Sequence, residues 1–61
     1  MIPPKDKAME LMLRYYELIP MNTVSFAKQC AVITAEELIT YAYNNYDANY
    51  WKEVKQYIIE I

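Results

Sequence analysis

Residues that could bind a ligand gather near the start of the last helix that the sequence predicts. Between positions 43 and 55 they are Tyr43, Tyr46, Tyr50, Trp51, Lys52 and Lys55. Aromatic faces can stack on a nucleobase, lysines can pair with phosphate, and a helix N-terminus presents N–H groups to an anion. Because Trp51, Lys52 and Lys55 share one side of a helix, we expect them to converge on a small nucleotide-like anion. The alternative is that the aromatic residues pack in the core or in an interface, and that the two lysines only face solvent.

Residue sets suited to catalysis are nearly absent from the chain. It contains no histidine, which is the usual general base and the commonest metal ligand, and no glycine for a phosphate-binding loop. Glu36 and Glu37 are neighbours, so on a helix they point in different directions and cannot work as an acid–base pair. Cys30 is the single cysteine, and we expect it to pack as a small apolar residue, with a reactive thiol as the alternative. We therefore predict a protein that is not an enzyme and needs neither a metal nor another cofactor.

Helices are the elements that would position these residues, predicted at about 4–19, 23–43 and 48–61. In each segment apolar residues recur at helical spacing, and Pro20 ends the first one. The short connections favour antiparallel neighbours. The sequence therefore predicts an all-α fold, a small three-helix bundle with a long central helix, formed by residues 1–61 as one domain.

The connection between the second and third helices is predicted as a turn over residues 44–49. Because the chain has no glycine, we expect asparagine to adopt the left-handed backbone conformation there. Asp47 or Asn49 would then act as the N-cap of the third helix.

The predicted core uses one apolar stripe from each helix. Alanines dominate the stripe of the central helix, so a neighbouring helix can approach it closely. The stripe of the third helix is expected to follow Tyr50, Val54, Tyr57 and Ile61. The core residues predicted across the chain are Ala8, Leu11, Met12, Tyr15, Ala27, Ala31, Ala35, Leu38, Val54 and Ile58.

A group of large apolar side chains falls outside these stripes. They are Leu13, Tyr16, Phe26, Ile33 and Ile59. A domain of this length buries only about 60% of the surface that its unfolded chain exposes, and small domains often compensate by oligomerising. We therefore predict a homo-oligomer that uses these residues as its interface, with a monomeric bundle as the alternative.

Charge and hydropathy limit the possible partners. Eight acidic residues against six basic residues give a net charge of −2, which disfavours binding to nucleic acid phosphates as the main function. The chain has no apolar stretch of about 20 residues for a membrane span and no signal-peptide pattern at its start. We expect a cytoplasmic protein that does not contact a membrane.

The chain contains PKDKAMEL at 4–11, AKQCA at 27–31, AEELI at 35–39 and YWKEVKQ at 50–56. In this order the segments resemble small uncharacterised helical proteins encoded by phages and prophages of Bacteroidetes-type bacteria. The resemblance covers nearly the whole chain but rests mostly on helical scaffold. It implies expression in the cytoplasm of an infected bacterium and supplies no site residues.

These observations together predict a non-enzymatic, oligomeric binding protein of phage origin that serves counter-defence. Its most specific version is a sponge that sequesters a small anionic nucleotide immune signal between subunits. One alternative is a structural component of the virion or its assembly, or an inhibitor that binds a host protein. A third is a small transcription-modulating DNA-binding factor, which the acidic charge disfavours.

Overall fold

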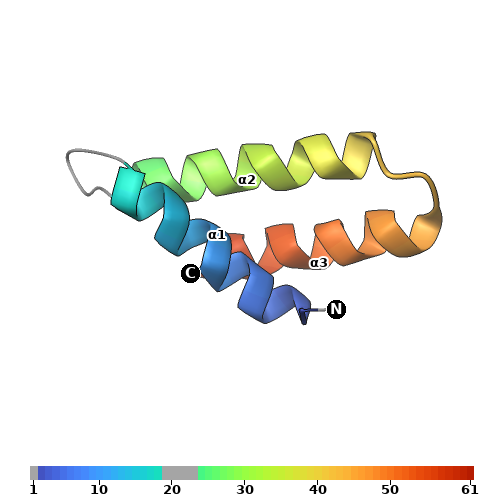
Figure 1. Ribbon diagram of the computed structural model, residues 1–61, viewed down its shortest axis with the longest axis horizontal. Helices are drawn as coiled ribbons and strands as arrows, with labels where there is room; N and C mark the ends of the chain where they lie inside the picture. Colours follow the sequence, from blue (N-terminus) through green and yellow to red (C-terminus); the bar gives the residue numbers. More distant parts are fainter. Residues whose placement is uncertain (1, 19–23) are drawn as a thin grey trace.

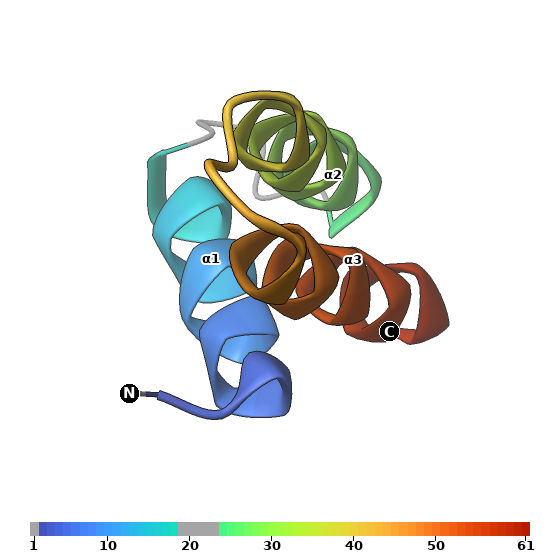
Figure 2. The same cartoon turned by 90° about the vertical axis from the view of Figure 1, so that its right-hand side faces the viewer.

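The computed structural model describes residues 2–18 and 24–61, and these residues form a compact all-α bundle. In chain order the helices are α1 (Pro4–Leu18), α2 (Val24–Thr40) and α3 (Asn45–Glu60). Helices α2 and α3 lie antiparallel along the long axis, and α1 crosses them obliquely (Figure 1). Seen from the end, they form a triangle in which each helix packs against the other two (Figure 2). The predicted class of fold, a three-helix all-α bundle, is thereby confirmed for the described part of the chain.

Helix α2 ends at Thr40, three residues before the predicted end at 43. The amide of Tyr41 still donates a helical bond to the Glu37 carbonyl at 3.1 Å, but the amide of Ala42 turns to the Ile39 carbonyl at 3.3 Å. This shift from i−4 to i−3 bonding tightens the chain into a turn. The prediction ran too far because the apolar residue at 42 continues the helical spacing after the helix has ended. Pro20 and the predicted helix ends near 19 and 23 lie outside the described residues.

Helix α3 begins at Asn45, three residues before the predicted start at 48. Its N-cap is Asn44, whose side-chain oxygen accepts the Asp47 amide at 2.8 Å. The prediction that Asp47 or Asn49 caps the helix is therefore wrong, because both residues lie inside it. Asn44 has a φ of −148°, so it caps from an extended conformation and not from the left-handed one. Asp47 instead places a carboxylate in the first turn, where the helix dipole favours it.

The core lies where the helices meet and is built largely from small side chains. Its buried residues, taken over the described ranges, are Ala8, Met12, Ala27, Ala31, Ala35, Val54 and Ile58. Five further residues pack partly buried against them, namely Leu11, Tyr15, Val32, Tyr50 and Trp51. The buried stripe of α2 consists of alanine alone, so the backbones of α1 and α3 can come close to it.

Three predicted core positions lie at the surface instead. Leu38 is 37% exposed, because α1 diverges from the C-terminal half of α2 (Figures 1 and 2). Tyr57 and Ile61 are also exposed, since the buried side of α3 runs through Val54 and Ile58. The stripe on α3 is therefore rotated relative to the predicted one.

Polar side chains join α2 to both of its neighbours. Thr34 donates its hydroxyl proton to the Cys30 carbonyl at 3.0 Å, so the Tyr15 hydroxyl is the donor in its 2.5 Å bond to Thr34 Oγ1. These two hydrogen bonds join α1 to α2. Lys55 Nζ lies 3.1 Å from Glu36 Oε2 and ties α3 to α2. Within the described ranges, none of the helices is long and apolar enough to cross a membrane.

Candidate functional site

The buried stripe of α3 separates the predicted ligand-binding residues into groups that face different neighbours. Tyr50 lies on the flank of α3 nearest the start of the chain, where its hydroxyl donates to the Ile2 carbonyl at 2.6 Å. Lys55 lies on the opposite flank, where it pairs with Glu36 of α2. Val54 is fully buried between these flanks. The six residues therefore do not converge on one ligand within a single subunit.

The flank of α3 that carries Tyr50 borders a shallow hollow of about 290 Å³. The hollow lies between the first residues of the chain and the start of α3, and it is lined by Ile2, Pro3, Pro4, Tyr46, Asn49, Tyr50 and Glu53. Tyr46 and Tyr50 supply aromatic faces, but among the described lining residues the charged one is Glu53. A carboxylate at this position repels an anion, so the hollow is poorly suited to phosphate.

Trp51 and Lys55 already make contacts that hold the fold together. Trp51 packs partly buried against the core and meets the Tyr50 ring edge-on, with ring centroids 5.1 Å apart and an interplanar angle of 87°. The charge of Lys55 is already balanced by the carboxylate of Glu36. Neither side chain is thus available to a ligand without the loss of an existing contact.

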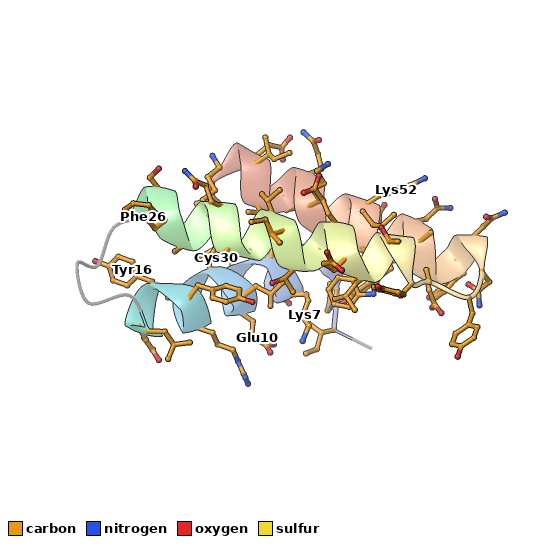
Figure 3. All side chains as sticks on the ribbon, turned by 90° about the horizontal axis from the view of Figure 1, so that it is seen from above. Lys7, Glu10, Tyr16, Phe26, Cys30 and Lys52 are labelled. Carbon is orange, nitrogen blue, oxygen red and sulfur yellow. The ribbon has the colours of Figure 1, made fainter. Side chains whose placement is uncertain are left out.

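The remaining members of the predicted ligand site face solvent. Tyr43 is 99% exposed, and it precedes the N-cap of α3. Lys52 projects from the outer side of α3, away from Lys7 and Glu10 of α1 (Figure 3). Tyr43, Tyr46 and Lys52 are therefore exposed, and Tyr46 also lines the hollow beside Tyr50.

Potential metal ligands do not cluster in the described part of the chain. Among the described residues, no group of three or more histidine, cysteine or acidic residues is placed to hold a metal ion. Cys30 is partly buried and carries a free thiol, and it lies on the side of α2 toward α1 (Figure 3). Glu10 is bound by its neighbours, with Lys7 Nζ at 3.2 Å and Arg14 Nε at 3.7 Å.

Large apolar side chains on the outside of the bundle form the more extensive candidate surface. Leu13, Phe26, Ile33 and Ile59 are each 45% to 58% exposed, and Tyr16 is 37% exposed. Phe26 and Tyr16 sit at the end of the molecule where α1 ends and α2 begins (Figure 3). These residues are spread over α1, α2 and α3, with two on α1, two on α2 and one on α3.

The outer side of α2 also contains residues that the sequence did not single out. An open hollow of about 470 Å³ is lined by Ser25, Lys28, Gln29, Val32 and Ile33. The Lys55–Glu36 pair joins α3 to the same helix near its C-terminal end. Lys28 and Gln29 gave no signal in the sequence because polar residues on a helix normally face only water.

The chain matches no family model, and no curated protein and no solved structure shows significant similarity to it. What its surface binds therefore has to follow from the placement of its own residues.

Proposed function

We propose that this chain is a non-enzymatic binding protein that acts as a homo-oligomer. The observation that supports the proposal is the exposure of Leu13, Phe26, Ile33 and Ile59 around a core built largely from alanine. Full burial of a side chain of this size contributes about 1.5–3 kcal/mol. These residues lie outside the core that the described part of the chain forms, and contact with a second copy would supply that burial.

The resemblance to phage-encoded helical proteins extends this proposal to a biological setting. We propose that the oligomer acts in the cytoplasm of an infected bacterium and counters host defence by binding a host protein. An apolar surface of this kind favours a protein partner over a nucleotide. The same surface would suit packing into a virion, and detection of the protein in purified virions at a fixed copy number would favour that alternative.

The mass of the protein in solution tests the oligomer. Light scattering should give a mass above the 7.3 kDa of one chain, and Ile33→Lys should lower it, because a lysine cannot be buried without a partner. Gln56→Lys adds the same charge at an exposed polar position of α3 and should leave the mass unchanged. Circular dichroism must show equal helicity in all three proteins. A wild-type protein of 7.3 kDa at every concentration would refute the proposal.

The nucleotide version of the proposal requires a site shared between subunits. Its support is that Tyr43, Tyr46 and Lys52 are exposed and uncommitted to the core, so two copies could bring aromatic faces and an amine to one anion. Titration calorimetry with cyclic nucleotides and ADP-ribose derivatives tests it directly. We expect Lys52→Ala to weaken binding and Lys5→Ala, an exposed lysine of α1, to leave it unchanged. The absence of heat with every nucleotide would remove this version and leave the oligomer proposal intact.

A further inference from the structure

The hollow between the start of the chain and α3 combines aromatic rings with a carboxylate. On α3 it is lined by four residues that recur at spacings of three and four positions, namely Tyr46, Asn49, Tyr50 and Glu53. Such spacing places side chains along one side of a helix. The opposite wall is formed by residues 2–4, which are apolar. Both walls therefore present their side chains to the same small space.

Glu53 brings to this hollow a negative charge that the described part of the chain leaves without an ion-pair partner. The ion pairs of the described residues engage Glu10 and Glu36, and none of them engages Glu53. Glu53 lies in the middle of α3, whereas the positive end of a helix dipole acts mainly within the first turn. The hollow therefore favours a cation over an anion.

The two tyrosines add surfaces that suit an organic cation. A cation over the face of an aromatic ring, within about 6 Å of its centre, is attracted by the electrons of the ring. Tyr46 is 70% exposed, so its ring is open to a ligand. Tyr50 is held in place, because its hydroxyl donates to the Ile2 carbonyl at 2.6 Å and its ring meets Trp51 edge-on. Part of the site is thus ordered before a ligand arrives, which lowers the entropic cost of binding.

We propose that this hollow binds the guanidinium group of an arginine side chain from a partner protein. A guanidinium is planar and weakly hydrated, so it can stack on a tyrosine ring while it donates to Glu53 and to the side-chain oxygen of Asn49. A lysine ammonium is compact and strongly hydrated, and it fits such a mixed site less well. The aliphatic stem of arginine can lie on the apolar wall formed by residues 2–4.

The size of the hollow favours a side chain over a free small molecule. Its volume of about 290 Å³ is at the lower end of the range for ligand sites, and such sites usually bury most of the ligand surface. A shallow hollow can hold the end of a side chain but cannot enclose a whole ligand. We therefore assign the guanidinium to a protein.

The arginine site is separate from the residues proposed for the oligomer. None of Leu13, Phe26, Ile33 and Ile59 lines the hollow, so arginine binding does not require self-association. The site rests on the proposed function in one respect, namely that the chain binds another protein.

An NMR titration with a capped glycine–arginine–glycine peptide tests the site. We expect saturable shifts at Tyr46, Tyr50 and Glu53, with a dissociation constant on the order of 1–10 mM, because one exposed ion pair and one ring contact supply the affinity. The matched peptide with citrulline has the same shape without the charge and should not saturate the site. The matched peptide with lysine should bind about two- to fivefold more weakly.

Substitutions in the hollow test which side chains hold the cation. Glu53→Gln keeps the shape of the side chain and should raise the dissociation constant of the arginine peptide about two- to fivefold. Glu60→Gln is the matched control, because Glu60 is an exposed glutamate of α3 that does not line the hollow. Tyr46→Leu keeps an apolar side chain but removes the ring, and should weaken binding by a similar factor.

Methylguanidinium separates a side chain on a protein from a free small cation. It carries the same head group without the stem, so it should bind more weakly than the arginine peptide. Equal binding of the two would overturn the assignment to a protein partner.

The remaining outcomes decide between the arginine site and the proposed function. Shifts that the citrulline peptide reproduces, no saturable shift, or equal effects of Glu53→Gln and Glu60→Gln would overturn the arginine site. Amide spectra show whether each variant is folded, and Tyr46→Leu replaces Glu53→Gln if that variant is not. Light scattering reports on the oligomer separately. A monomer that binds the arginine peptide would refute only the homo-oligomer, and an oligomer that does not bind it would overturn only the arginine site.

Discussion

The two sides of α2 use apolar residues of opposite size. The fully buried residues on the inner side are all alanines, namely Ala27, Ala31 and Ala35. The outer side carries Phe26 and Ile33, which are larger and more than half exposed. A helix that only had to build its own core would place the large residues inside and polar ones outside. The reversal indicates that close helix contact stabilises the fold, while the large residues are available for binding.

The largest difference in stability between a buried and an exposed position is expected at two neighbouring isoleucines of α3. Ile58 is fully buried and Ile59 is exposed. Ile58→Ala should lower the free energy of unfolding by about 2–5 kcal/mol, since it removes atoms from the core and leaves a cavity. Ile59→Ala should lower it by less than about 0.5 kcal/mol in dilute, dissociated protein. Urea denaturation followed by circular dichroism measures both, and equal losses would show that the exposed position also supports the fold of one subunit.

A smaller effect is expected when the inner side of α2 is made larger. Ala31→Leu forces three extra carbon atoms between helices that meet at an alanine stripe. It should lower the free energy of unfolding by about 1–3 kcal/mol. Ile33→Leu, two positions away on the outer side, should change the stability of the monomer by less than about 0.5 kcal/mol. The comparison of the two sides would fail if Ala31→Leu were tolerated as well as Ile33→Leu.

A smaller loss of stability is expected at the N-cap of α3. Asn44→Ala removes the oxygen that accepts the Asp47 amide and should lower the free energy of unfolding by about 1 kcal/mol. Asn49 lies inside α3, where alanine is the better helix former, so Asn49→Ala should be neutral or slightly stabilising. Thermal unfolding monitored by circular dichroism gives both values. The reverse order would restore Asn49 as the cap.

The sequence predicted the class of fold and the alanine stripe because periodicity and proline positions are local signals. It predicted less well the residues whose state depends on how helices cross. Leu38 has the same spacing as Ala31 and Ala35, but the oblique course of α1 leaves it at the surface. The start of α3 was misplaced because Asn44, Asp47 and Asn49 are all suitable caps, and only the backbone geometry of Asn44 distinguishes them.

The predicted ligand site also depends on contacts between helices that the sequence does not show. The presence of aromatic residues and lysines on one short segment could be read from the sequence. The contacts that occupy Tyr50 and Lys55 could not, because they depend on Ile2 and on Glu36 of α2, which reach α3 through tertiary contacts. The exposed apolar residues were easier to recognise, since each of them departs from a local stripe.

The central claim is that the exposed apolar residues bind a second copy of the chain, and NMR spectra recorded during dilution test it most directly. We expect side-chain signals among Leu13, Phe26, Ile33 and Ile59 to shift with concentration, while those of Ala31 and Val54 in the core stay constant. Signals of the exposed residues that do not move at any concentration would contradict the claim.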